Sequence, residues 1–142
     1  MAAFVVQRLA SPAGAATTRS RVFGGALVAA GLTTSVLAAR SFQRAGTTLD
    51  PGRPEEARVL VTTGLHGVSR NPMYLGLIGV LLGHAVWRRS SWALVPAVAA
   101  WAWLDRVQVP AEEQAMQDRH GVDYQAYLRR VPRWLGPVVD GD

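Results

Sequence analysis

Thirteen residues near the middle of the chain, 64–76, bring ionisable, polar and helix-breaking groups to the start of an apolar run. Proline is tolerated in the first turn of a helix and pushes the preceding residue out of the helical region, so Pro72 predicts the start of a helix. Arg70 and Asn71 then lie at the mouth of that helix, with Tyr74 within its first turn. An arginine at such a place can hold a carboxylate or a phosphate.

A pair of carboxylates, Glu112 and Glu113, follows Pro110 after the next apolar run. Carboxylates beside a pocket can bind an amino group or hydroxyl groups of a ligand. A structural interpretation stays open, because acidic residues in the first turn of a helix also favour the helix dipole. Likewise, Arg70 and Arg106 could be ordinary anchors at a membrane interface, and Tyr74 could belong to an aromatic belt.

Three runs nearly free of charge must position these residues: 22–39, 71–87 and 90–104. Helices of these lengths span roughly 27, 25 and 22 Å, slightly less than the roughly 30 Å hydrocarbon core of a bilayer. Arginine and tryptophan at their ends can reach the interface. The chain is therefore predicted to be an all-α polytopic membrane protein with about three transmembrane helices. A soluble bundle with buried helices is the alternative, and a signal peptide is a second interpretation of the first run.

The second and third runs are joined only by Arg88 and Arg89, and a link this short predicts an antiparallel helical hairpin. Residues whose numbers sum to about 178 then lie at the same depth, so that Arg106 is opposite Pro72 and Glu112 is opposite His66. The hairpin therefore gathers the polar candidates at one membrane face.

Arginine is distributed unevenly between the two predicted membrane faces. Ten of the fifteen arginines fall on the face that carries the polar candidates and five on the other. By the positive-inside rule the polar face is expected in the cytoplasm, and three helices then leave the N-terminus outside. The predicted location is an integral membrane position, with the bacterial inner membrane inferred from the arginine-only composition.

The C-terminal part, with Met116, Tyr124 and Tyr127 at helical spacing, predicts an interfacial cytoplasmic helix that Gly121 interrupts. The chain is predicted to form a single domain over residues 1–142. Its parts are an N-terminal segment 1–21, a membrane helix 22–39, a cytoplasmic connection 40–70, the helical hairpin 71–106 and a cytoplasmic C-terminal segment 107–142.

Composition excludes several other classes of function. The chain contains no cysteine, so disulfides, thiolate metal sites and cysteine nucleophiles are excluded, and no metal site is expected. The formal net charge of +5 comes from arginines that flank apolar runs and do not cluster on one soluble face, which speaks against nucleic-acid binding. No Gly-rich dinucleotide loop is present, so a soluble Rossmann-type enzyme is not supported.

The ordered set of motifs from about residue 46 to residue 135 resembles the superfamily of isoprenylcysteine carboxyl methyltransferases and phospholipid methyltransferases, which are integral-membrane enzymes that use S-adenosylmethionine. The set comprises Gly-Thr-Thr at 46–48, Leu-Val-Thr-Thr-Gly at 60–64, Arg-Asn-Pro-Met-Tyr-Leu-Gly at 70–76, the apolar hairpin, Arg106, Glu112-Glu113, Gly-x-x-Tyr-x-x-Tyr at 121–127 and Val-Pro-Arg-Trp at 131–134. Each motif alone is weak evidence for this superfamily, whereas the complete set in this order is a specific signal for it.

The resemblance implies a pocket that holds S-adenosylmethionine between the hairpin and the cytoplasmic segments. In the carboxyl methyltransferases a short strand-like segment and an Arg-His-Pro-x-Tyr box surround the cofactor, and carboxylates after the hairpin also hold it. The resemblance carries over a catalytic set of Arg106, Tyr74 and Glu112, in which Arg106 matches an arginine near the methyl acceptor. The implied cofactor-binding residues are Leu60, Val61, His66, Arg70, Asn71, Pro72, Met73, Tyr74, Glu112 and Glu113.

Two departures from the carboxyl methyltransferase pattern concern the acceptor. Asn71 replaces the usual histidine, which brings the motif closer to the phospholipid enzymes, and His66 stands where tyrosine is frequent. The expected activity is methyl transfer to a membrane-resident acceptor, either a phospholipid amine or the carboxylate of an isoprenylcysteine-like or other small hydrophobic molecule. The alternative is a non-catalytic membrane scaffold that retains the fold, suggested by a segment before residue 22 that is shorter than in relatives.

Overall fold

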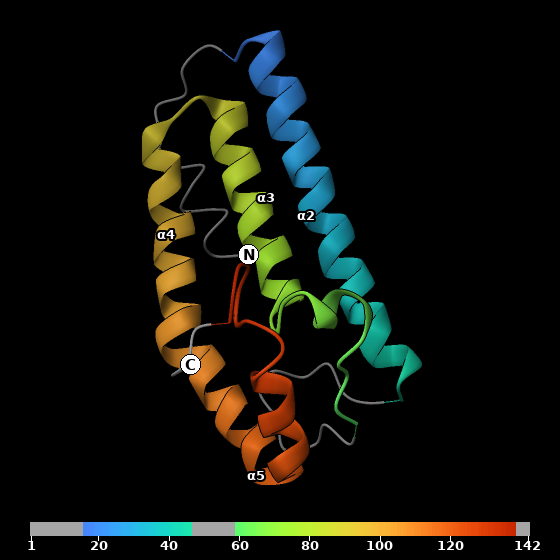
Figure 1. Cartoon of the computed structure of the whole chain (residues 1–142). Coiled ribbons are helices and arrows are strands. Elements are labelled where there is room, and N and C mark those ends of the chain that lie inside the picture. Colours follow the sequence, from blue (N-terminus) through green and yellow to red (C-terminus); the bar gives the residue numbers. More distant parts are fainter. Residues whose placement is uncertain (1–15, 47–58, 139–142) are drawn as a thin grey trace.

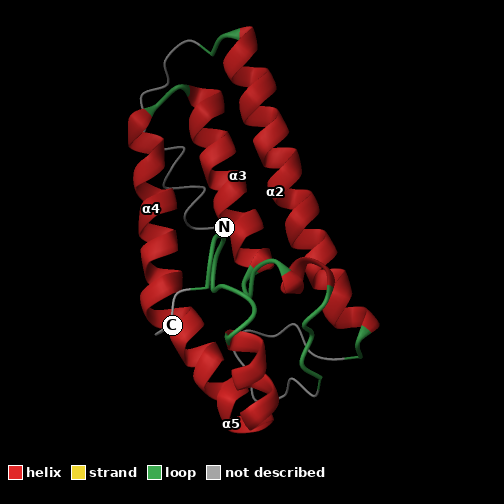
Figure 2. Cartoon of the chain, viewed as in Figure 1, coloured by secondary structure: helices red, strands yellow, loops and turns green. Residues whose placement is uncertain are grey.

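The computed structural model describes residues 16–46 and 59–138, which form helices and connecting loops, and no strand occurs in these two ranges (Figures 1 and 2). The all-α prediction is therefore confirmed for the described chain. Residues 60–63, for which the resemblance implied a strand-like segment, form a loop here. Most of the predicted N-terminal segment, and the Thr47-Thr48 motif with the turn that follows it, lie outside the described residues.

Helix α2, Thr18–Arg44, is the first described element and extends beyond the predicted run at both ends. The side chain of Thr17 caps it by accepting a hydrogen bond from the backbone nitrogen of Ser20 at 3.2 Å. Its most apolar 18-residue window has a mean hydropathy of 1.8 and is only 17% buried. Within the described ranges α2 is the one helix whose length and composition suit a membrane span, a test that an N-terminal signal sequence would also pass. The three-span topology remains a prediction.

Helix α3, Pro72–Arg88, begins at the predicted proline and packs along α2 (Figure 1). Glycines bring the two backbones into contact: a Cβ atom on Gly24 would lie 2.6 Å from the carbonyl oxygen of Gly83. Hydrogen bonds join the pair near both ends, from Ser20 Oγ to the carbonyl of Trp87 and from Ser35 Oγ to the carbonyl of Met73. Small residues thus set the spacing of these helices.

The predicted hairpin turns at Arg89, which adopts a left-handed conformation with φ of 49° and ends α3. The chain returns through the short 3-10 helix η3, Ser91–Ala93, into α4, Leu94–Trp103. The helical path does not stop at residue 106, where the hairpin was expected to end. A π-helical turn η4, Leu104–Gln108, joins α4 directly to α5, Val109–Leu128, to make one long curved rod (Figure 1).

The far end of α5 folds back at Gly121, whose φ of 48° and ψ of −115° are not helical, as the sequence predicted. After this kink Tyr124 and Tyr127 are buried together with Val131, and Met116 and Leu128 pack against them. Residues 131–135, here named the C-terminal strap, then cross back toward the start of α3 (Figure 1).

Candidate functional site

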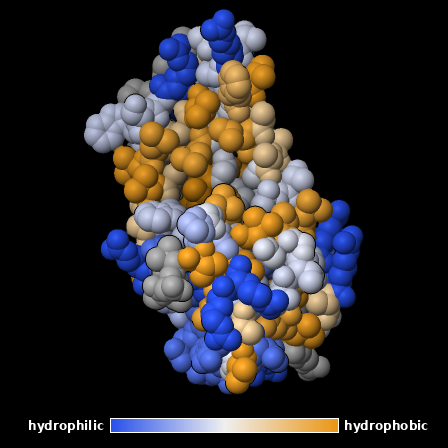
Figure 3. Space-filling model, viewed as in Figure 1, coloured by the Kyte–Doolittle hydropathy of each residue, from blue (hydrophilic) through white to orange (hydrophobic). Residues whose placement is uncertain are grey.

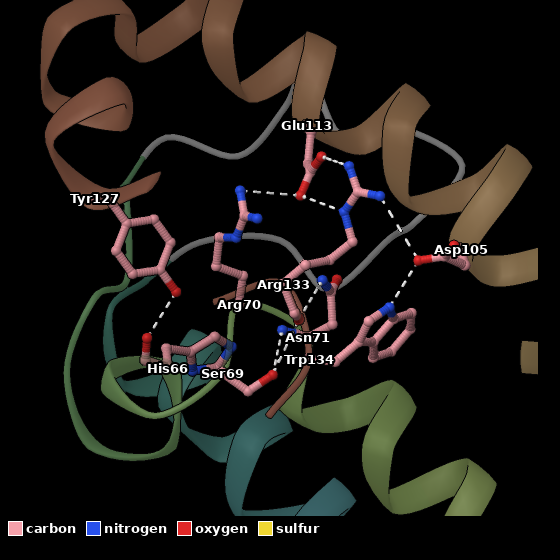
Figure 4. Close-up of polar contacts among 9 residues, drawn as sticks. All are labelled: His66, Ser69, Arg70, Asn71, Asp105, Glu113, Tyr127, Arg133 and Trp134. Atoms are coloured by element: carbon pink, nitrogen blue, oxygen red, sulfur yellow. Dashed lines mark hydrogen bonds and ion pairs between the residues drawn. The ribbon is translucent and has the colours of Figure 1, made fainter. Parts of the chain in front are cut away.

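The site is built where the C-terminal strap meets the loop before α3. Three groups of this loop donate hydrogen bonds to the strap's carbonyls. The Arg70 backbone nitrogen donates to Pro132 at 2.9 Å. Ser69 Oγ and Asn71 Nδ2 both donate to Arg133, each at 3.1 Å (Figure 4). Asn71, at the N-cap position of α3, makes no side-chain capping bond. Its amide fixes the strap and does not cap the helix.

Charged side chains from four parts of the chain meet above this junction (Figure 4). Arg133 binds Glu113 with two nitrogens, Nη2 to Oε2 at 2.7 Å and Nε to Oε1 at 3.2 Å. Its Nη1 also lies 3.6 Å from Asp105 Oδ1, which accepts a 2.7 Å hydrogen bond from Trp134. Arg70 Nη1 approaches Glu113 Oε1 at 3.2 Å. Two arginines therefore share one carboxylate, while Asp105 fixes the strap.

Arg70 is nevertheless incompletely satisfied. Its side chain is only 3% exposed, yet its Nε and Nη1 atoms form no hydrogen bond with any described residue, and the approach of Nη1 to Glu113 is an ion pair that lacks hydrogen-bond geometry. A buried donor without an acceptor is costly, most of all on a charged group. The guanidinium therefore has spare donors at the centre of the site.

Glu112 points to different partners from those of Glu113. Its Oε1 atom accepts hydrogen bonds from Tyr74 Oη at 2.6 Å and from Gln108 Nε2 at 2.7 Å. Burial raises the pKa of Glu112, and these two hydrogen bonds oppose the rise. Because α5 continues from η4 without a break, Glu112 does not lie at a free helix N-terminus, and the helix-dipole interpretation of this carboxylate does not hold.

His66 lies at the base of the site in the short 3-10 helix η2, Gly64–Gly67. Its Nδ1 atom is 3.2 Å from Ser41 Oγ, and its ring meets the Phe42 ring edge-on with centroids 4.7 Å apart. Tyr127 Oη donates a 2.6 Å hydrogen bond to the His66 carbonyl. Burial lowers the pKa of His66 to about 4, so the ring is neutral at physiological pH.

A cavity of about 90 Å³ lies between these groups. Its charged wall comes from Arg70, Glu112 and Glu113, and its apolar wall from Phe42 and Met116, among others. Burial raises the pKa values of Tyr124 and Tyr127, which also line it, so both phenols stay protonated. The cavity thus combines opposite charges with an apolar side.

Most of the predicted cofactor residues meet at this cavity. Tyr74 reaches it through the hydrogen bond to Glu112. Pro72 faces a separate apolar groove, and the Met73 carbonyl accepts a hydrogen bond from α2. The predicted cofactor residues that line the cavity directly are Leu60, Val61, His66, Arg70, Asn71, Glu112 and Glu113.

Arg106 is not brought to the cavity. It lies exposed on η4, and Asp105 beside it makes the inward contacts. The prediction of its depth assumed a regular helix, whereas a π-helical turn contains more residues than an α-helical one and so changes which side chains face inward.

The sequence interpretation did not place Asp105, Gln108, Tyr124, Tyr127 or Arg133 among the site residues. The Tyr-x-x-Tyr and Val-Pro-Arg-Trp motifs did mark Tyr124, Tyr127 and Arg133 as parts of an ordered pattern. No local pattern distinguished Asp105, because its partners Trp134 and Arg133 lie in the strap. The i, i+4 spacing of Gln108 and Glu112 could have marked Gln108, since these two side chains are hydrogen-bonded.

These features define a helical protein with a buried, charge-bearing pocket beside a membrane-length helix. A family model described as phospholipid methyltransferase matches residues 20–122. The chain belongs to this family, which is in the same superfamily as the isoprenylcysteine carboxyl methyltransferases. Its members are membrane proteins, and the family indicates a methyltransferase that acts on a membrane lipid with S-adenosylmethionine as methyl donor.

One relative is an uncharacterized protein of Haemophilus influenzae, 30% identical over 63 residues. The matched stretch covers 44% of this chain and all of that relative. No solved structure matches the chain.

Proposed function

We propose that the cavity binds the amino-acid end of S-adenosylmethionine and that the protein transfers its methyl group to a membrane lipid. One observation carries the proposal: spare donors of a buried arginine and a carboxylate with one unused oxygen line the same small cavity. An α-amino acid is a zwitterion, and its two charges complement these two groups. Family membership supplies the reaction class.

Arg70 would hold the carboxylate of the cofactor. A carboxylate accepts hydrogen bonds from two guanidinium nitrogens at once, and among the described residues Nε and Nη1 of Arg70 donate no hydrogen bond. Such a bond would satisfy donors that are buried and unmatched in the described chain.

Glu112 would hold the cofactor's ammonium group. Both of its hydrogen bonds go to Oε1, and within the described ranges Oε2 has no hydrogen-bond donor. A bound cation would lower the raised pKa of this carboxyl and so favour its charged form. Tyr74 and Gln108 would keep it in orientation.

The size of the cavity fits the amino-acid end alone. Pockets that enclose whole small molecules measure roughly 300 to 1,000 Å³, whereas this cavity measures about 90 Å³. Its apolar rim, formed by Phe42, Leu60, Val61 and Met116, offers a surface for the rest of the cofactor. We place His66 and Asn71 in the cavity wall that supports the cofactor, and Pro72 and Met73 at the start of α3 behind that wall.

Bound S-adenosylmethionine supplies an electrophilic methyl group on a sulfonium, and transfer is an in-line displacement that requires no metal. Alignment of donor and acceptor then provides much of the rate. The chain's contribution is to hold the cofactor by opposite charges at Arg70 and Glu112. Exposed Arg106 would meet an anionic group of the acceptor at the membrane surface.

The acceptor is proposed to be a membrane lipid with an amine head group, with the carboxylate of an isoprenylcysteine-like or other small hydrophobic molecule as the second class. In this proposal the helices α2, α3 and α4 span the bacterial inner membrane and the cavity faces the cytoplasm. The surface supports it: an apolar region lies below a hydrophilic tip, and hydrophilic residues gather again, among apolar ones, toward the opposite end (Figure 3).

The proposal is tested by calorimetric binding of S-adenosylmethionine and of its decarboxylated analogue to the detergent-purified protein. Hydrogen bonds to charged groups contribute roughly 1.5 to 3 kcal/mol, so the wild type should prefer the intact cofactor by about tenfold or more. Arg70→Met should reduce this preference toward one, whereas Arg129→Lys, an exposed control, should keep it.

Equal binding of the two compounds by the wild type would remove Arg70 from the cofactor site. Failure of the folded wild type to bind either compound would overturn the methyltransferase proposal and favour a non-catalytic scaffold.

A further inference from the structure

A second hollow, of about 270 Å³, lies between α2 and α3. Leu27 and Thr34 of α2 and Leu75 and Gly79 of α3 line its length, and Leu135 of the C-terminal strap closes one side. None of its lining residues also lines the cofactor cavity. We name this second hollow the interhelical groove.

The interhelical groove exists because its floor is made of small residues. A Cβ atom on Gly31 would lie 2.5 Å from the carbonyl oxygen of Gly76, so the helices touch through their backbones at this point. Gly79 and Ala30 also line the groove and carry little or no side chain into it. The neighbouring Leu27 and Leu75 are long, so they form walls around a bare floor.

The lining of the groove suits a hydrocarbon. Ser69 and Thr34 provide its only side-chain hydroxyls within the described chain. The Ser69 hydroxyl is already engaged with the Arg133 carbonyl and the Asn71 nitrogen. Burying a polar ligand there would cost free energy without hydrogen bonds to compensate. One wall of the groove is α2, and only 17% of the most apolar 18-residue window of α2 is buried in the protein. The groove therefore adjoins an apolar surface that favours lipid chains.

A wall one chain thick separates the groove from the cofactor cavity. Along the segment 65–72, Leu65, Ser69 and Pro72 face the groove, while the adjacent His66, Arg70 and Asn71 face the cavity. The C-terminal strap has the same division, because Leu135 lines the groove and Arg133 belongs to the ion cluster. A molecule whose chain fills the groove would therefore bring its head group to the edge of the cavity.

From this juxtaposition we infer that the interhelical groove binds one hydrocarbon chain of the methyl acceptor, which makes the acceptor an amphiphile held by its chain as well as by its head. The inference rests on the proposed methyl transfer. It adds a binding site whose lining residues are distinct from those of the cofactor cavity.

Gly79→Leu is the variant that tests the groove. A Cβ atom at residue 79 would meet only the Gly31 Cα, at the ordinary contact distance of 3.5 Å, so this position accepts a Cβ atom without parting the helices. Because Gly79 lines the groove, we expect the rest of the leucine side chain to occupy groove volume. Ala29→Leu is the matched control, because Ala29 is exposed on the same helix pair and does not line the groove.

The first measurement is photolabelling in nanodiscs by a phosphatidylethanolamine that carries a diazirine in one acyl chain, with labelled residues located by mass spectrometry. We expect Gly79→Leu to reduce labelling of Leu27 and Leu75 at least fivefold and to leave labelling of the exposed Val22 and Val36 unchanged. Ala29→Leu should label like the wild type. Undiminished labelling of the groove residues in Gly79→Leu would overturn the inference.

The second measurement is transfer of a tritiated methyl group from S-adenosylmethionine to a bacterial polar lipid extract. Gly79→Leu should lower the rate at least tenfold while its affinity for S-adenosylmethionine stays within twofold of the wild type, and Ala29→Leu should match the wild type in both. An unchanged rate would overturn the inference. If the wild type fails to bind the cofactor, the proposed function fails, and the labelling result still decides whether the groove holds a hydrocarbon chain.

Discussion

Glu112 and Glu113 are neighbours in the sequence but belong to different structures. Glu113 is held between Arg70 and Arg133, and its side chain is 16% exposed. Glu112 instead accepts hydrogen bonds from Tyr74 and Gln108. The first carboxylate therefore compensates charges that hold the C-terminal strap, and the second is available to a ligand.

This division predicts opposite effects of the two amide substitutions. Glu113→Gln should lower the free energy of unfolding by about 2 kcal/mol, because two largely buried arginines lose their shared counter-ion. Glu112→Gln keeps a hydrogen-bond acceptor for Tyr74, so it should leave the melting temperature nearly unchanged but weaken S-adenosylmethionine binding by about tenfold. Thermal unfolding and calorimetry of both variants check this, and the reverse pattern would exchange the two roles.

His66 makes stability depend on pH. Its pKa is lowered by burial from the ordinary value of 6.5 to about 4, so the unfolded chain binds its proton at a higher pH than the folded chain does. The contribution of neutral His66 to the free energy of unfolding is fully present above about pH 6.5. It is lost as the pH falls toward 4 and changes no further below that.

Melting temperatures of the wild type measured between pH 7 and pH 4 should therefore decrease more steeply than those of His66→Phe. The phenylalanine ring can keep the edge-on contact with Phe42 and has no proton to bind. Parallel curves for the two proteins would contradict a neutral, buried His66.

At the scale of elements, the contact of α2 with α3 depends on glycine at defined positions. A Cβ atom on Gly83 would lie 2.7 Å from the backbone nitrogen of Val28, and a backbone cannot give way as a flexible side chain can. Gly83→Ala should thus destabilise the protein by about 1 to 3 kcal/mol, the usual cost of overpacking. Gly79→Ala, with its ordinary 3.5 Å contact, is the matched control.

Gly79→Ala should leave the stability of the protein unchanged or raise it slightly, since alanine is favoured over glycine in a helix by up to about 1 kcal/mol. Denaturation of the two alanine variants in detergent measures the difference. Equal stability of both would show that the helices do not depend on backbone contact at Gly83.

For the whole molecule, the absence of cysteine permits a direct test of the proposed topology. A single cysteine can be placed at Ser91, in the turn after α3, or at Val122, which is 77% exposed in α5. With the proposed orientation, a membrane-impermeant maleimide added to intact cells should label Ser91→Cys at once and Val122→Cys only after permeabilisation. Labelling of both residues from the same side would contradict the proposed spans.

The sequence by itself determined the local features of this protein. Pro72 begins α3, Gly121 interrupts the last helix, and the short link at Arg88 and Arg89 folds two helices back on each other. Each follows from steric and hydrogen-bonding rules that act over about four residues or fewer, so each can be predicted from neighbouring residues.

Only the tertiary structure decided which side chains meet. The spacing of a regular helix put Arg106 with the polar cluster, but Arg106 lies exposed on the π-helical turn η4. Glu112 instead meets Tyr74 across the fold. The strap contacts of Arg133 and the interhelical groove also depend on residues far apart in the sequence. A small change in rotation along one helix changes all such pairings at once, and no rule confined to neighbouring residues fixes that rotation.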